Sequence, residues 1–390
     1  MKRFLLHRKG VFALLLALFL GMGTAYAYDF SATCSTGQTL YYNITNTTEY
    51  YVEITYPGTI NDWWGDYPKP TGDITLPSTV THDGVTYTVT SISWYAFFEC
   101  TDLTGSLTIP NTVDFIGYGA FMWCDGFSGT LTLSNALNVI QGRAFIGCTG
   151  LTGTLTIPTS VLTIGNEAFR GCTGFTGSLN IPNSVTSIGN NAFCDCSGFT
   201  GTLTIGTSVA SIGQSAFKNC NGFSQVNYNA INCANVISDD KPFENCSGTL
   251  TIGNTVQRIP SYMFNDADGL VGSLTIPNSV TVVGHCAFQA CDGFTGSLTI
   301  GNSVTTIESG TFGWCPNFSG TLTIGSSVTT IEEFAFYEDS NFTGSLTIPN
   351  SVTTIGDYAF SGCGFTGSLT IGYSLTSIGY MAFHSCNGFT

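Results

Sequence analysis

The sequence GSLNIPNSVTSIGNNAFCDCSGFT, residues 177–200, recurs with small changes through most of the chain. Nearly the same 24 letters begin at Gly153 and again at Gly201. A fixed period of about 20–29 residues is typical of leucine-rich repeats, whose units must stack because one unit cannot bury its own apolar face. The period therefore predicts one elongated solenoid, although 390 residues would otherwise suggest two or three globular domains.

The pattern of apolar residues within this stretch predicts the shape of one unit. Leu179 and Ile181 alternate with polar residues, as they do in a strand with one buried face. A Pro-Asn-Ser turn follows, and Val185 and Ile188 then mark a second short extended segment. Each unit is thus expected to add one strand to a parallel ladder and to bury its apolar side chains between its neighbours.

A short helical element is expected next, because Ala192, Phe193 and Cys196 have helical spacing over too few residues for an α-helix. We predict a 3₁₀ or single helical turn at this place in every unit. The phenylalanine of this turn recurs at Phe97, Phe121, Phe145, Phe169, Phe193, Phe217, Phe243, Phe264, Phe288, Phe312, Phe336, Phe360 and Phe383. The predicted fold class is therefore a mainly β repeat protein, a leucine-rich-repeat solenoid of about 13 units of 24 residues.

The N-terminal 27 residues have the pattern of a secretory signal peptide. Four Lys and Arg residues flank the start of an apolar segment at 11–20, and Ala25-Tyr26-Ala27 fits a cleavage site. We predict cleavage after Ala27 and a secreted or cell-surface protein. The alternative is a retained membrane anchor, for which the apolar segment is short. After cleavage, no later segment is apolar enough to insert into a membrane.

The rest of the chain divides into two predicted parts. Residues 28–72 lack the repeat and contain aromatic and β-branched runs, so we predict an N-terminal β-rich cap, with a small independent binding domain as the alternative. Residues 73–390 form the predicted solenoid, which includes a divergent repeat at 225–247. The sequence stops at Thr390 within a unit, so we predict that the C-terminus is truncated.

The charge of the predicted mature chain limits its partners. Without the four cations of the signal peptide, 6 Lys and Arg remain against 25 Asp and Glu, a formal net charge of −19. Such a chain repels nucleic acid and anionic lipid. Only 9% of all residues are charged, so the surface must consist largely of Thr, Ser, Asn and Gly. This composition suits polar, uncharged partners, although it is also common in secreted repeats.

Fifteen cysteines in a secreted chain would ordinarily indicate disulfides. Eleven of them occupy one place in the repeat: Cys100, Cys124, Cys148, Cys172, Cys196, Cys220, Cys246, Cys291, Cys315, Cys363 and Cys386. Ala267 and Asp339 stand at this place in two other units, so no thiol is required there. We interpret the position as a small buried apolar site, with a ladder of disulfides between units as the alternative.

No catalytic or metal-binding motif is present in the sequence. The predicted mature chain has three histidines, His82, His285 and His384, in different repeats and without a second ligand at metal spacing. The adjacent acids Glu332 and Glu333 do not by themselves place two carboxylates across a cleft, as a glycosidase requires. We therefore predict no catalytic residue, no metal and no cofactor.

Variation between the units is concentrated beside each Ala-Phe pair. We call the two residues before this pair and the two after it, taken over all units, the variable band. The band contains aromatic residues and arginine, which are favoured at binding hot spots. Its candidate ligand-binding residues are Tyr118, Trp123, Arg143, Arg170, Tyr262, Trp314, Tyr337, Tyr358 and Tyr380. The alternative is that these positions vary because nothing constrains them.

The repeat SLTIPNSVTxIGxxAFxxCxGFT resembles the BspA-like leucine-rich repeat family of bacterial cell-surface proteins over about residues 74–390. The resemblance implies a parallel-stranded solenoid exported to the cell surface. Characterised members act as adhesins or surface antigens, and some bind host extracellular-matrix proteins. We therefore expect an adhesin-like protein that binds a protein or glycoprotein. The alternatives are a carbohydrate-binding surface module and a passive spacer or antigen without a specific ligand.

Overall fold

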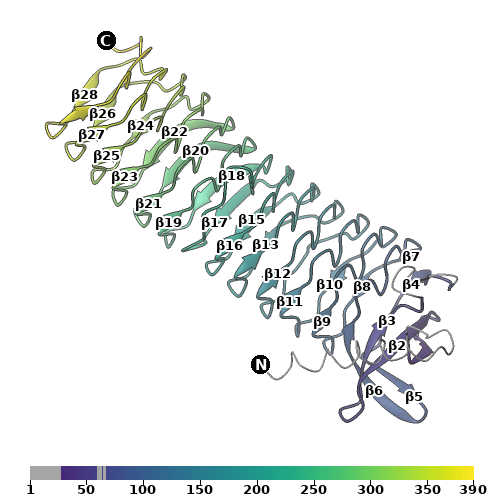
Figure 1. Ribbon diagram of the computed structural model, residues 1–390. Helices are drawn as coiled ribbons and strands as arrows, with labels where there is room; N and C mark the ends of the chain where they lie inside the picture. The colour runs from purple at the N-terminus through teal and green to yellow at the C-terminus, as the bar shows by residue number, and fades with distance from the viewer. Residues whose placement is uncertain (1–27, 59–63, 65–66) are drawn as a thin grey trace, which may run out of the picture.

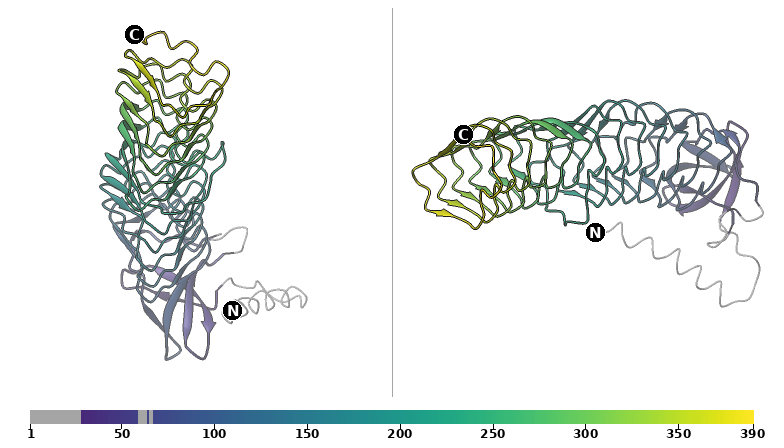
Figure 2. Two further views of the ribbon diagram at one scale, coloured as in Figure 1. Left: turned by 90° about the vertical axis from the view of Figure 1, so that its left-hand side faces the viewer. Right: turned by 90° about the horizontal axis from the view of Figure 1, so that it is seen from above.

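Successive copies of the repeat stack in a 24-residue register. Leu179 lies opposite Leu203 in parallel pairing, and Asn180 lies opposite Thr204. The computed structural model describes residues 28–58, 64 and 67–390, and the predicted signal peptide lies outside them. The described chain is an elongated coil of stacked turns, with its N-terminal strands at one end (Figures 1 and 2). The predicted solenoid is confirmed.

The first ladder consists of the Leu-Thr-Ile strands, in which Leu and Ile face the core and Thr faces solvent. Its longest sheet runs in the order β13-β15-β17-β18-β20-β22-β24, and β8–β10, β26–β28 and β4–β7 form two-stranded pairs. The strands are β4 (Gly72–Asp73), β7 (Leu103–Thr104), β8 (Leu107–Thr108), β10 (Leu131–Thr132), β13 (Leu179–Asn180), β15 (Thr202–Ile205), β17 (Gln225–Tyr228), β18 (Gly248–Ile252), β20 (Leu270–Ile276), β22 (Phe294–Ile300), β24 (Leu322–Thr323), β26 (Leu346–Ile348) and β28 (Leu369–Ile371).

The second ladder consists of shorter strands, most of which end in a buried Ile. It is divided into two sheets, β6-β9-β11-β12-β14-β16 and β19-β21-β23-β25-β27-β29. The strands are β6 (Val85–Ile92), β9 (Phe115–Ile116), β11 (Val139–Ile140), β12 (Thr163–Ile164), β14 (Ser187–Ile188), β16 (Ser211–Ile212), β19 (Arg258–Ile259), β21 (Val282–Val283), β23 (Thr306–Ile307), β25 (Thr330–Ile331), β27 (Thr354–Ile355) and β29 (Ser377–Ile378).

Four strands at the N-terminal end extend the second ladder. They are β1 (Phe30–Thr33), β2 (Thr39–Asn46), β3 (Tyr51–Thr55) and β5 (Thr79–His82). β1, β2 and β3 pair antiparallel, β3 pairs parallel with β6, and β5 forms a hairpin with β6. The N-terminal segment is thus continuous with the solenoid sheet, and its role as a cap stays a prediction.

The divergent repeat interrupts only one of the two ladders. β17 pairs with β15 on one side and with β18 on the other, so the first ladder passes through this unit. The second ladder stops at β16 and begins again at β19. Between these two strands, the Asn235 side chain accepts hydrogen bonds from the Arg258 guanidinium and from the backbone N–H of Ser261. Together with the backbone hydrogen bond from the Val236 N–H to the Ser261 carbonyl, this side chain links the units where the strand pairing is missing.

The segments with the Ala-Phe pair form a third ladder, and they require a correction in detail. The N–H groups of Ala192, Cys194 and Cys196 each bond to the carbonyl three residues earlier, as a 3₁₀ turn requires. The N–H groups of Asn191, Phe193 and Asp195 instead bond to carbonyls of the next unit. This alternation prevents a regular helix, and no helix occurs among the described residues. We call these segments the turn ladder.

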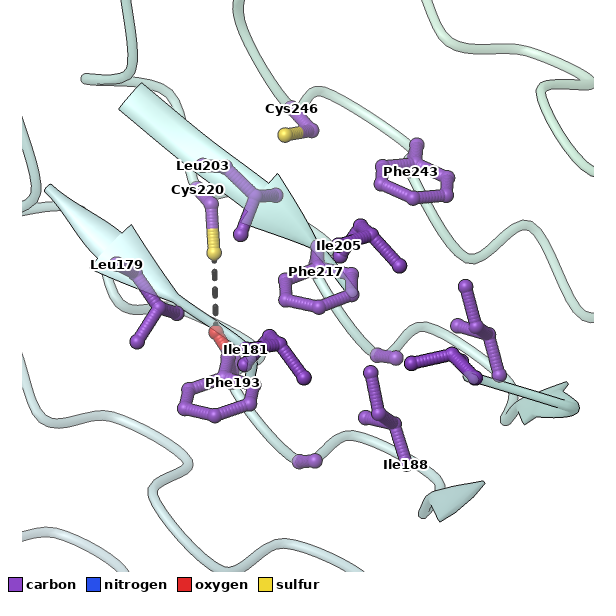
Figure 3. Packing of buried hydrophobic residues seen from close by; sticks show 14 of the residues in the cluster. Leu179, Ile181, Ile188, Phe193, Leu203, Ile205, Phe217, Cys220, Phe243 and Cys246 are labelled. Carbon is purple, nitrogen blue, oxygen red and sulfur yellow. Dashed lines mark hydrogen bonds between the residues drawn. The ribbon is translucent and has the colours of Figure 1, made fainter. Parts of the chain in front are cut away.

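The core is a set of stacked columns of like side chains. The thirteen predicted phenylalanines form one column of rings, nearly parallel except at Phe243 and Phe264, which are tilted by 32°. The rings of Phe193 and Phe217 are 5.5 Å apart (Figure 3). A second column runs through Phe175, Phe199 and Phe223, with ring separations of 6.0 and 5.3 Å. Each ring covers its neighbour, so burial of apolar area supplies most of the stabilisation between units.

The repeated cysteines are free thiols in the structure. The Cys220 thiol donates a hydrogen bond to the carbonyl oxygen of Phe193 at 3.1 Å, and eight other units have the equivalent bond (Figure 3). Burial raises the pKa of the Cys148 and Cys246 thiols to about 12, so these thiols stay protonated at neutral pH. The interpretation as small buried residues omitted this hydrogen bond.

Candidate functional site

The variable band lies on the turn ladder, whose backbone has an uncommon conformation. In all thirteen turns, two residues have φ between +39° and +79°. One precedes the Ala-Phe pair or its counterpart, and the other lies two residues after the Phe. They are Tyr95, Glu99, Gly119, Trp123, Arg143, Gly147, Glu167, Gly171, Asn191, Asp195, Ser215, Asn219, Lys241, Asn245, Tyr262, Asp266, Cys286, Ala290, Gly310, Trp314, Phe334, Glu338, Tyr358, Gly362, Met381 and Ser385.

A positive φ favours Gly, Asn and Asp on local grounds, because other side chains clash with the backbone there. Ten of these twenty-six positions carry one of the three favoured residues. Seven carry Tyr, Trp, Phe or Arg instead. Because adjacent turns are hydrogen-bonded through the intervening N–H groups, the fold imposes the left-handed conformation whichever residue is present.

A cation already contacts both an aromatic ring and an acid near the N-terminal end of the band. The Arg143 guanidinium carbon lies 5.6 Å from the Tyr118 ring centre, at cation–π distance. The same guanidinium donates through Nε to the Glu167 carboxylate in the next turn, and this bond raises the Arg143 pKa. Tyr118, Arg143 and Glu167 therefore form an internal cation site across three successive turns.

Ion pairs continue along the central part of the band, which we call the central section (band residues 141–266). Arg170 lies 3.7 Å from Glu167 and 3.9 Å from Asp195, measured between nitrogen and oxygen. Lys218 pairs with Glu244 at 2.8 Å, and Lys241 pairs with Asp266. Every Lys and Arg in this section of the band thus has an acidic partner.

Aromatic side chains dominate the C-terminal part of the band, which we call the C-terminal section (band residues 309–385). Trp314 remains 39% exposed, and its ring lies 4.9 Å from that of Tyr337 and 6.2 Å from that of Phe334. Phe334 stacks on Tyr358 at 5.3 Å, and Tyr358 meets Tyr380 edge to face at 5.5 Å. These five rings form one continuous surface over four turns.

A shallow hollow of about 360 Å³ lies beside Trp314. Its lining includes Pro316 and the carboxylate-bearing side chains of Asp292 and Glu338. No Lys or Arg follows Arg258 in the sequence, so no cation of the chain's C-terminal third faces these acids. The hollow therefore combines an aromatic wall with two carboxylates.

All nine candidate residues lie on the band, and none of them is buried. Tyr118 contacts Arg143, and Arg143 and Arg170 share Glu167. Trp314, Tyr337, Tyr358 and Tyr380 belong to the aromatic surface of the C-terminal section. The other two candidates pack on band residues outside the candidate set. Trp123 lies 5.5 Å from Phe98, and Tyr262 lies 5.3 Å from His285.

Four aromatic residues of the band were missed by reasoning from the sequence: Trp94, Tyr95, Phe98 and Phe334. Phe334 stacks within the C-terminal section, but Glu332 stands where most units have Gly, which obscured the alignment of this unit. The other three lie in the first unit, where Trp94 is 61% exposed. An alignment centred on the Ala-Phe pair would have found all four.

The described residues contain no group of three or more His, Cys, Asp or Glu side chains placed to hold a metal ion. The Lys and Arg side chains of the band pair with acids, and its exposed groups include aromatic rings, amides and carboxylates. Within the described ranges, no helix is long and apolar enough to cross a bilayer.

Comparison with one of three similar solved structures supports the fold. A leucine-rich repeat protein from Bacteroides ovatus is 24% identical, with 93% of each chain covered and a TM-score of 0.59. A leucine-rich cell surface protein from Faecalibacterium prausnitzii is 23% identical, with 90% of this chain and 95% of the other covered and a TM-score of 0.41. The pneumococcal vaccine antigen PcpA is 15% identical, covering 92% and 86%, with a TM-score of 0.42. Curated proteins give no match.

The repeat itself is matched by a family model. The model of the BspA type leucine-rich repeat region, in six copies, matches residues 78–200, 152–271 and 259–390. These overlapping matches cover the chain from residue 78 to its last residue. The chain therefore belongs to the BspA-type leucine-rich repeat family.

Proposed function

We propose that this chain is a secreted or surface-displayed, adhesin-like interaction protein that binds a protein or glycoprotein through the variable band. The extracellular matrix of a host is the proposed source of the partner, in keeping with the family. The proposal includes export by the predicted signal peptide and no catalytic role. Membership of a surface-protein family supports display, and the band supports binding.

One observation carries the proposal: bulky aromatic side chains occupy backbone positions that favour glycine and asparagine. Trp123, Trp314 and Tyr358 have φ of 59°, 58° and 55°. A non-glycine residue held at positive φ costs about 1 kcal/mol or more. Random drift would tend to remove such residues, because Gly or Asn relieves the strain without disturbing the core. Their presence at these positions supports a use outside the fold.

The proposal is tested with two glycine substitutions, Trp123→Gly and Trp314→Gly. Glycine adopts positive φ without strain, so both variants should keep the fold and the melting temperature. Binding to a panel of purified extracellular-matrix proteins should weaken at least about tenfold for a partner that uses these rings. Surface plasmon resonance measures the change.

The matched control is Tyr373→Ala, since Tyr373 is 85% exposed and lies outside the band between β28 and β29. The control should bind as the unmodified chain does. If no matrix protein binds, or if the two glycine variants bind normally, the proposal is wrong and a passive spacer is favoured.

A carbohydrate is the second candidate ligand, and the hollow beside Trp314 is the observation that favours it. Exposed aromatic rings next to carboxylates can stack on a sugar and accept hydrogen bonds from its hydroxyls. A glycan array probed with the unmodified chain and with Trp314→Gly tests this candidate. Binding to a glycan, but to no matrix protein, would favour it.

A further inference from the structure

The internal cation site shows which groups of the band hold a positive charge. The Arg143 guanidinium lies over the Tyr118 ring and bonds to the Glu167 carboxylate of the next turn. The ring and the acid come from turns on either side of the arginine. The arrangement needs only an aromatic ring, a carboxylate and the spacing between adjacent turns, which the solenoid repeats along its whole length.

The C-terminal section repeats the ring and the acid without the cation. Trp314 and Tyr337 supply rings 4.9 Å apart, and Glu338 and Asp292 line the hollow beside Trp314. Seven acids after residue 266 form no ion pair among the described residues and are not buried: Asp268, Asp292, Glu308, Glu332, Glu333, Glu338 and Asp357. Their charges add to one negative field around the hollow.

The chain has no spare cation to satisfy this section. Six Lys and Arg residues lie in the described part of the sequence, all at or before Arg258. Five of them pair with acids, and Arg258 donates to the Asn235 side chain. A positive charge at the hollow must therefore come from another molecule.

We propose that the C-terminal section of the variable band binds a lysine- or arginine-containing segment of the protein partner. One cationic side chain lies over Trp314, and its charged group faces Glu338 and Asp292. This inference rests on the proposed function and specifies the chemistry of the partner. The cation–π attraction and the two carboxylates act on the same group, much as the Tyr118 ring and the single Glu167 carboxylate do at Arg143. A neutral sugar would leave both carboxylates without a counter-charge.

The experiment uses the full chain and two fluorescein-labelled twelve-residue peptides. One peptide alternates Arg with Gly, and the other has Gln in place of Arg. We expect the Arg peptide to bind at about 0.15 M salt, more tightly than the Gln peptide and less tightly as salt is raised. Fluorescence anisotropy gives the dissociation constants.

Two variants locate the binding, because net charge alone would attract any cation. Trp314→Gly removes the ring, and Glu338→Asn removes one carboxylate at a position where φ is 62° and Asn is tolerated. Each should weaken binding of the Arg peptide by about tenfold. Asp114→Asn makes the same change in net charge at an exposed site outside the band, and Tyr373→Ala removes an exposed ring elsewhere. Both controls should bind within about twofold of the unmodified chain.

Three results would overturn the inference. The first is equal affinity for the Arg and Gln peptides. The second is an equal loss in Glu338→Asn and in Asp114→Asn, which would indicate attraction by net charge alone. The third is displacement by a neutral hexasaccharide, with Trp314→Gly impaired and Glu338→Asn unaffected, which would indicate a glycan site. If a matrix protein still binds through Trp123 or Trp314 in any of these cases, the proposed function stands and only this inference fails.

Discussion

The central and C-terminal sections of the variable band have the same backbone but different surface chemistry. Both consist of hydrogen-bonded turns with two left-handed residues per unit, over the same column of phenylalanine rings. In the central section, Arg170, Lys218 and Lys241 are paired with acids from nearby turns. In the C-terminal section, rings and acids occur without any Lys or Arg.

The comparison shows how a repeat separates folding from recognition. Residues that face the core are nearly invariant between units, because each must match its copies above and below. Residues of the turn ladder are held by backbone hydrogen bonds, so their side chains can change from unit to unit without altering the fold. In one section, Lys and Arg can therefore pair with acids of the same chain, while another section has acids without any Lys or Arg.

The largest expected effect tests whether the two sections share one core. Phe193→Ala in the centre and Phe336→Ala in the C-terminal section each remove a fully buried ring between two stacked neighbours. Each should lower the free energy of unfolding by about 3–5 kcal/mol, because a cavity remains. Urea unfolding followed by circular dichroism measures this. A shift at only one of the two positions would contradict the shared core.

A second, smaller effect concerns a core position at which the sections differ. Asp339 occupies the cysteine position, is completely buried, and accepts a hydrogen bond from the Cys315 N–H through Oδ1 at 2.8 Å. Its Oδ2 is buried without a hydrogen-bond partner. Burial raises the Asp339 pKa well above its usual value, with Cys315 and Glu338 adding to the shift. Burial also raises the pKa of the Cys363 thiol, and the neighbouring Asp339 adds to that shift.

The raised pKa fixes the sign of the pH dependence. A carboxyl with a higher pKa in the folded state binds more protons than it does unfolded, so its contribution to stability is lost as pH rises from about 4 through the raised pKa. Asp339→Cys removes this loss and restores a thiol at this position. We expect the variant to be more stable by about 1–3 kcal/mol at neutral pH and about equal to the unmodified chain near pH 4.

Thermal melts of both chains between about pH 4 and 8 measure the difference in stability. The reverse change, Cys220→Asp, is the control in the central section, where the thiol donates to the carbonyl of Phe193. It should create the same pH-dependent loss. If the stability difference between Asp339→Cys and the unmodified chain does not change with pH, the assignment of a neutral buried carboxyl is wrong.

The fold could be predicted well from the sequence, because each core position of the unit occurs thirteen times along the chain. The alternation at Leu179 and Ile181 and the recurring Phe193 each correspond to a buried side chain in the structure. The left-handed turns escaped prediction, since Tyr95 and Trp123 do not have the composition that signals positive φ. The thiol hydrogen bonds also escaped, because a small buried residue can be Ala or Cys on packing grounds alone.

The candidate site could be predicted only as a list of positions. Arg143 follows Tyr118 by 25 residues and precedes Glu167 by 24 residues. Whether these side chains touch depends on the rotamers that they adopt in neighbouring turns. The division of the band into a paired and an unpaired section follows from the absence of Lys and Arg after residue 258, which is visible in the sequence. The sequence alone does not show how a cation would bind to this surface. The contacts of Arg143 show that a cation here lies over an aromatic ring and bonds to a carboxylate.

The smallest expected effect measures the internal cation directly. Arg143→Met removes a guanidinium that is partly exposed, together with its contacts to Tyr118 and Glu167. Exposed ion pairs and cation–π contacts are weak, so the free energy of unfolding should fall by about 0.5–1 kcal/mol, and by less in about 1 M salt. Glu338→Gln in the C-terminal section is the matched comparison, measured by the same urea titration.

Glu338 lacks a cationic partner among the described residues and lies next in sequence to the buried Asp339. Its neutralisation should therefore leave stability unchanged or raise it slightly, whereas Arg143→Met should lower it. Equal losses in the two variants would mean that Glu338 has a stabilising role within the fold. The C-terminal acids would then belong to the architecture of the solenoid, and the case for an external cation at the hollow would be lost.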